Sequence, residues 1–155
     1  MVYTRGMLAI GTPIPDLSLP GVDGTLVKLR GLVGAKTLVL YFYPKDLSPG
    51  CTKHACGFRD AYETFLGAGA DVIGVSTGSP AVRAEMISAN RIPVTLLQDV
   101  DGAARTAFGV GKFLGLDMRV TFVIDRSGLV RHVSDSQLRV GKHISEALAC
   151  VKDLA

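Results

Sequence analysis

The chain has 155 residues, of which 48% are hydrophobic and 20% are charged, and its formal net charge is +3. This length suits one domain with a hydrophobic core, expected to span residues 1–155, and the composition excludes a disordered chain. Because the excess of basic residues is spread along the chain without a basic run, we predict no nucleic-acid partner.

The three cysteines are too few for a disulfide-stapled secreted domain. The opening stretch MVYTRGMLAIGTPIPD has only a short apolar patch before Gly11 and Pro13, so it does not resemble a signal peptide. No apolar run approaches the roughly 20 residues that a membrane-spanning helix needs. We therefore expect a cytoplasmic protein that does not associate with a membrane.

The first predicted elements are a β-hairpin and a central strand. Alternating apolar and polar residues at 17–19 and 26–29 flank a turn-rich stretch that contains Asp23-Gly24, a pattern typical of a hairpin. The apolar run Thr37–Tyr43 ends at Pro44. Such β-branched and aromatic runs are typical of a strand buried on both faces.

Helices and strands then alternate. A helix is predicted from about residue 49 to 66, and a buried strand over residues 70–76. Ser79-Pro80 supplies an N-cap and a proline at the first helical position, so a second helix is predicted to run to about Asn90. This order predicts parallel strands.

The second half adds shorter elements. They are a strand at 95–98, a short helix from Asp101 to Phe108, two strands at 119–125 and 129–134 joined as a hairpin, and a final helix at 142–154. Parallel units followed by an antiparallel hairpin predict an α/β fold with a mixed central sheet flanked by helices.

Cys51 is a candidate nucleophile at the start of the first helix. Ser48 can cap that helix, Pro49 suits its first position, and Cys51 then occupies the third. A thiolate at this place lies in the positive end of the helix dipole, which lowers the pKa of a thiol. The alternative is a buried structural cysteine, the usual role of an arbitrary cysteine.

Cys56 follows five residues later in the same helix. Five helical residues advance about 7.5 Å and rotate about 140°, which separates the two Cα atoms by roughly 8 to 9 Å. A disulfide needs Cα atoms within about 7 Å. A bond between Cys51 and Cys56 therefore requires the first turns of the helix to unwind.

Other site types find little support. Cys51, His54 and Cys56 could be read as metal ligands, but Cys56 lies on another helix face and no fourth ligand is local, so we predict no metal site. Gly109-Val110-Gly111 lacks the spacing of a dinucleotide loop, and we predict no cofactor. Cys150 lies on the apolar side of the last helix and is assigned a structural role, with competition against Cys56 as a weaker alternative.

The segment 41–60 resembles the peroxiredoxin family, specifically its peroxiredoxin Q or bacterioferritin comigratory protein subgroup. The likeness rests on YFYPKD, SPGCTK and ACGFRD, and extends to 11–19, 72–76 and 119–125. It implies a thioredoxin-like fold, reduction of hydroperoxides and, for many members, a monomer. Thr is commoner in the family at position 48, where Ser keeps the hydroxyl, and many members have Glu at position 54, so His54 removes a negative charge near the nucleophile.

The resemblance implies a peroxide site of Pro44, Ser48, Cys51 and Arg119, with Cys56 as the resolving cysteine. Attack of the Cys51 thiolate on a peroxide creates negative charge on the leaving oxygen, which Arg119 and the Ser48 hydroxyl are suited to stabilise. The resulting sulfenic acid can condense with a thiol, and thioredoxin or a similar dithiol would reduce the disulfide. An alternative is a redox-sensing or interaction protein that uses the same disulfide without turnover.

Overall fold

The computed structural model describes residues 7–44, 49–113, 116–137 and 139–155, and for residues 49–51, 54, 113 and 116 it describes the backbone only. A five-stranded sheet forms the centre, in the order β5-β4-β3-β8-β9. Its strands are β3 (Thr37–Phe42), β4 (Ala70–Ser76), β5 (Thr95–Gln98), β8 (Val120–Ile124) and β9 (Val130–Ser134). The first three are parallel, and β8 and β9 run antiparallel to their neighbours.

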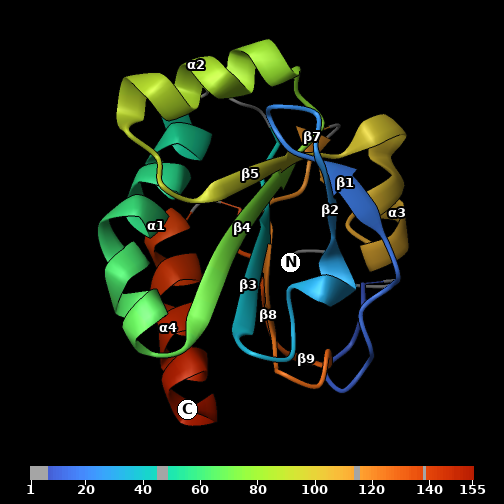
Figure 1. The fold of residues 1–155 in the computed structure, drawn as a ribbon, viewed down its shortest axis with the longest axis vertical. Helices are drawn as coiled ribbons and strands as arrows, with labels where there is room; N and C mark the ends of the chain where they lie inside the picture. The colour runs from blue at the N-terminus through green and yellow to red at the C-terminus, as the bar shows by residue number, and fades with distance from the viewer. Residues whose placement is uncertain (1–6, 45–48, 114–115, 138) are drawn as a thin grey trace.

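Helices and a hairpin cover the two faces of this sheet (Figure 1). On one side lie α1 (Pro49–Gly67), α2 (Pro80–Asn90) and α4 (Val140–Leu154). On the other side lie α3 (Ala103–Phe108) and the antiparallel pair β1 (Ser18–Pro20) and β2 (Leu26–Lys28). Short elements complete the described chain: the 3-10 turns Leu29–Gly31 and Val100–Gly102, and the small ladder of β6 (Lys112–Phe113) with β7 (Leu116–Asp117).

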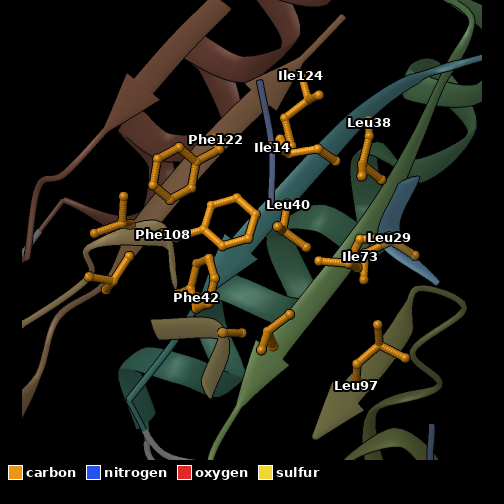
Figure 2. Close-up of a cluster of buried hydrophobic side chains, with 14 of the residues drawn as sticks. Ile14, Leu29, Leu38, Leu40, Phe42, Ile73, Leu97, Phe108, Phe122 and Ile124 are labelled. Atoms are coloured by element: carbon orange, nitrogen blue, oxygen red, sulfur yellow. The ribbon is translucent and has the colours of Figure 1, made fainter. Parts of the chain in front are cut away.

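Two apolar cores fill the spaces on either side of the sheet. The hairpin-side core includes Ile14, Leu29, Leu38, Leu40, Phe42, Ile73, Phe108 and Phe122 (Figure 2). The helix-side core includes Val39, Tyr41, Tyr43, Phe58, Phe65, Val72, Met86, Ala147 and Val151. Successive side chains of β3 enter opposite cores, because neighbouring residues of a strand point to opposite faces. This explains why the central strand is an unbroken apolar run.

The helix α1 packs closely on α4 at Gly57. A Cβ atom at this position would lie 2.1 Å from Cδ1 of Ile144, far inside ordinary contact distance. Glycine therefore removes the side chain where the two helices meet. The geometry therefore indicates that this glycine serves the close packing of α1 on α4.

The mixed sheet, its flanking helices and the N-terminal hairpin confirm the predicted fold class. Ser79 caps α2 as predicted, because its side chain accepts a hydrogen bond from the Val82 amide. Helix α4 begins at Val140, two residues earlier than predicted, with Val140 itself buried. The β6–β7 ladder was not predicted, since strands of two residues have no measurable period.

Among the described residues, no helix is both long enough and apolar enough to cross a membrane.

Candidate active site

The candidate site lies at the edge of the sheet where β3 ends and β8 begins. The register pairs Phe42, the last residue of β3, with Val120, the first residue of β8. Tyr43, which follows β3, and Arg119, which precedes β8, therefore adjoin the same edge. Pro44 follows and is half-buried. Residues 45–48, including Ser48, lie outside the described residues, and α1 then begins at Pro49.

Cys51 is the third residue of α1, as predicted. The first turn of this helix contains no acidic residue, so no carboxylate there offsets the positive end of the helix dipole. The Cys51 side chain is not among the described atoms. Its position therefore follows from the backbone, which places it in the first turn of a 19-residue helix.

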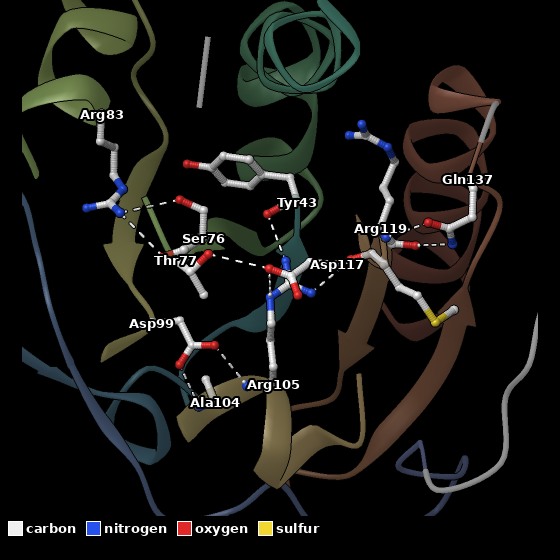
Figure 3. A network of polar contacts seen from close by, with 11 residues as sticks. Tyr43, Ser76, Thr77, Arg83, Asp99, Ala104, Arg105, Asp117, Arg119 and Gln137 are labelled. Atoms are coloured by element: carbon white, nitrogen blue, oxygen red, sulfur yellow. Dashed lines mark hydrogen bonds and ion pairs between the residues drawn. The ribbon is translucent and has the colours of Figure 1, made fainter. Parts of the chain in front are cut away.

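Arg119 is buried, with 5% of its surface exposed, and its backbone is held by a single side chain. The Arg119 amide donates to Oε1 of Gln137 at 2.7 Å, and Nε2 of Gln137 donates to the Arg119 carbonyl at 2.9 Å. Nε2 also donates to the carbonyl of Asp135 at 2.6 Å. The primary amide of Gln137 thus pairs with residue 119 much as a neighbouring strand would, and Figure 3 shows the Arg119 side chain extending away from it.

Arg105 joins the two chain segments that meet at this edge (Figure 3). Its Nη1 donates to the carbonyl of Met118 at 3.0 Å, and its Nη2 donates to the carbonyl of Tyr43 at 2.8 Å. The rigid fork of a guanidinium suits two acceptors at once. Arg105 therefore fixes the residue before Pro44 and the residue before Arg119 relative to each other.

Arg105 itself is held from several sides. The carboxylate of Asp99 accepts hydrogen bonds from the backbone amides of Ala104 and Arg105, at 2.7 and 3.0 Å, and so caps the start of α3. Nε of Arg105 lies 3.7 Å from Oδ2 of Asp117, and its guanidinium carbon lies 5.7 Å from the centre of the Phe42 ring. An ion pair and a cation–π contact thus accompany the burial of this charge.

His143 of α4 is buried and contacts β8, which begins one residue after Arg119. Its Nε2 faces the carbonyl of Ser136, which can only accept, so Nε2 carries the proton and Nδ1 accepts from the Thr121 hydroxyl at 2.8 Å. Burial lowers the pKa of His143, and the positive charge of Arg119 lowers it further. The ring is therefore a neutral support for this part of the site.

Cys56 is half-buried and faces α2 rather than the sheet edge. Its Sγ lies 3.7 Å from Oδ1 of Asn90, the last residue of α2. Cys150 is also half-buried, and burial raises the pKa of its thiol. It packs against the helix-side core, in keeping with the structural role predicted for it.

The structure brings Pro44 and Arg119 to one sheet edge, and the helix that carries Cys51 begins five residues after Pro44 in the sequence. Three supporting residues were missed by sequence reasoning: Arg105, Gln137 and Asn90. Each contacts a partner remote in sequence, and none stands in a pattern that could have identified it. Within the described residues, no group of three or more histidine, cysteine or acidic side chains is arranged to hold a metal ion.

Comparisons with known proteins identify the family of this chain. Residues 10–133 match the AhpC/TSA family. The chain is 40% identical over 151 residues to the chloroplastic peroxiredoxin Q of Triticum aestivum, covering 96% of this chain and 69% of that protein. It is 43% identical over 144 residues to the chloroplastic peroxiredoxin Q of Arabidopsis thaliana, covering 92% of this chain and 66% of that protein.

Solved structures give the same result. The crystal structure of peroxidoxin BcpB from Mycobacterium tuberculosis is similar with a TM-score of 0.88 at 35% identity, covering 96% of this chain and 99% of that one. Peroxiredoxin Q of Xanthomonas campestris has a TM-score of 0.83 at 32% identity, covering 96% of this chain and 97% of that one. The likeness in fold and in sequence extends over nearly the whole length of this chain. The chain therefore belongs to the AhpC/TSA family and, within it, to the peroxiredoxin Q or bacterioferritin comigratory protein group of thiol peroxidases with a thioredoxin-like fold.

Proposed function

We propose that this chain reduces hydrogen peroxide and organic hydroperoxides through Cys51, with Cys56 as the resolving thiol and thioredoxin or a similar dithiol as the reductant. The observation that carries the proposal is the register of β3 and β8. It sets a buried arginine beside the strand end that leads to the cysteine helix. A protein of Xanthomonas campestris that is 31% identical, the bacterioferritin comigratory protein, has been studied for alkyl peroxide reduction.

The first step is attack of the Cys51 thiolate on one peroxide oxygen. The S–O bond forms as the O–O bond breaks, and the other oxygen leaves as hydroxide or alkoxide and then takes a proton. Sulfur is oxidised by two electrons to a sulfenic acid. The guanidinium of Arg119 and the hydroxyl of Ser48 stabilise the developing negative charge, which is where donors contribute most to such a reaction.

The second step joins the two cysteines. The Cys56 sulfur attacks the sulfenic sulfur of Cys51, the S–S bond forms and water leaves. Because the two residues are five apart in α1, the first turns of that helix unwind for this step. A dithiol then reduces the disulfide through a mixed disulfide and becomes a disulfide itself. In this proposal residues 1–155 act as one monomeric domain in a reducing, cytoplasmic compartment.

Coupled peroxide consumption tests the proposal. With thioredoxin, thioredoxin reductase and NADPH, we expect multiple turnovers by the wild type and none by Cys51→Ser. The matched control is Cys150→Ser, which should keep turnover because that thiol takes no part. Absence of turnover in the wild type would favour the alternative of a redox sensor, and turnover by Cys51→Ser would contradict the role of Cys51.

Two further measurements test the resolving step. Cys56→Ser should accumulate a sulfenic acid that dimedone traps, and should lose cycling with thioredoxin. Hydrogen exchange should show lost protection around residues 50–58 when the wild type is oxidised to the disulfide. An unchanged helix in protein that is shown by mass spectrometry to hold this disulfide would contradict the unwinding.

A further inference from the structure

The side chain of Asn90 is oriented by its own helix, so that its oxygen faces the proposed resolving cysteine. Nδ2 of Asn90 donates to the carbonyl of Met86, one turn earlier in α2, at 3.1 Å. A carbonyl only accepts, so this contact determines which end of the amide is the NH2 group. The other end, Oδ1, is the atom 3.7 Å from Sγ of Cys56.

The backbone of Asn90 is also held by α1. Nη1 of Arg59 donates to the Asn90 carbonyl at 2.7 Å. Cys56 and Arg59 are three residues apart and are neighbours on the surface of α1. One residue at the end of α2 is thus contacted twice by α1, once at the thiol and once a turn later.

The contact has a direction, because only a protonated thiol can donate to an amide oxygen. The hydrogen bond therefore keeps Sγ of Cys56 turned towards α2. To attack Cys51, the sulfur must give up this contact.

We propose that Asn90 is a positioning residue for Cys56: it holds the resolving thiol against α2 and so slows disulfide formation after Cys51 is oxidised. The inference rests on the proposed function of Cys56. A slower second step lengthens the life of the sulfenic acid on Cys51. That intermediate is the species that excess peroxide converts to sulfinic acid.

The test compares two substitutions with opposite effects. Asn90→Leu keeps the approximate shape but removes the acceptor, and we expect disulfide formation to be about two- to fivefold faster, the effect of losing one weak hydrogen bond. Asn90→Asp keeps the acceptor and adds a negative charge beside the thiol, and it should slow disulfide formation severalfold. A merely structural role would change the rate in the same direction for both variants.

Each reduced variant is mixed with one equivalent of hydrogen peroxide, and samples quenched with alkylating reagent are measured by mass spectrometry. The rate of sulfenic acid formation should stay at the wild-type value, because the contacts of Asn90 are with Met86, Cys56 and Arg59. The rate of disulfide formation should change as stated, and the fraction of sulfinic acid at excess peroxide should fall in Asn90→Leu and rise in Asn90→Asp.

Ala89→Gly is the matched control. Ala89 is exposed next to Asn90, and glycine weakens the end of α2 while leaving the amide in place. Equal acceleration in Ala89→Gly and Asn90→Leu, or unchanged rates in both Asn90 variants, would overturn the inference. If the wild type itself forms no bond between Cys51 and Cys56, the proposed function fails instead, so the two failures are distinguishable.

Discussion

Gly57→Ala tests the packing of α1 on α4, on which the geometry of the cysteine helix depends. An alanine Cβ would lie 2.1 Å from Cδ1 of Ile144 and 3.5 Å from its Cγ1. The first contact is impossible and the second is ordinary. Alanine at position 57 therefore requires Ile144 to change rotamer or α4 to shift.

Two opposing effects determine the change in stability. Replacing glycine inside a helix by alanine stabilises it by about 0.8–1 kcal/mol. Forcing an extra methyl group into a packed contact costs about 1–3 kcal/mol. We therefore expect Gly57→Ala to lower the free energy of unfolding of the reduced protein by about 0–2 kcal/mol.

Ile144→Val supplies the matched background, because valine lacks the Cδ1 atom that the new methyl group would meet. In this background, alanine at position 57 should raise the free energy of unfolding by about 1 kcal/mol. The double-mutant cycle should thus give a coupling energy of about 1–3 kcal/mol. Urea denaturation followed by far-UV circular dichroism measures all four proteins.

The same cycle reports on the resolving step. If α1 unwinds as far as Gly57, alanine in the Ile144→Val background should slow formation of the disulfide by up to about fivefold, the equivalent of 1 kcal/mol. Equal stabilisation by alanine in both backgrounds would refute the close contact between the two helices. It would show that α4 yields freely at this position.

Three other predictions concern the supports of the site. Gln137→Glu keeps the acceptor for the Arg119 amide but cannot donate to the Arg119 carbonyl, so the second-order rate constant with peroxide should fall about tenfold; an unchanged constant in stopped-flow competition would contradict this role. Burial lowers the pKa of His143 in the folded protein, so as the pH falls the unfolded chain takes up this proton before the folded chain does. At pH values below about 6.5, the free energy of unfolding should therefore decrease by up to about 1.4 kcal/mol for each pH unit. His143→Asn should flatten this dependence in urea titrations. If the pH dependence of the free energy of unfolding persists in this variant, another titratable group must cause it. Arg105→Lys retains the charge but cannot donate to the carbonyls of Tyr43 and Met118 at the same time with a rigid guanidinium, and the variant should lose about 1–3 kcal/mol of stability. If denaturant unfolding gives the variant the stability of the wild type, one carbonyl contact suffices.

Local patterns in the sequence were enough to predict most elements. The run Thr37–Tyr43 predicted a strand buried on both faces, and the structure confirms it because β3 lies at the middle of the sheet with both cores against it. Ser79-Pro80 predicted the start of α2. These signals work because side-chain period and helix capping involve residues within one or two turns of each other.

The tertiary structure alone decided what supports the site. Arg105 contacts the Tyr43 carbonyl across 62 residues of chain, and Gln137 and Asn90 contact their partners across 18 and 34 residues. Each contact depends on the path of the chain and the strand register, which no local pattern encodes. The sequence by itself determined which residue types the chemistry could use and where the cysteine helix begins; the folded chain decided which distant side chains hold Arg119 and Cys56, because a hydrogen bond depends on proximity in space and not on distance along the chain.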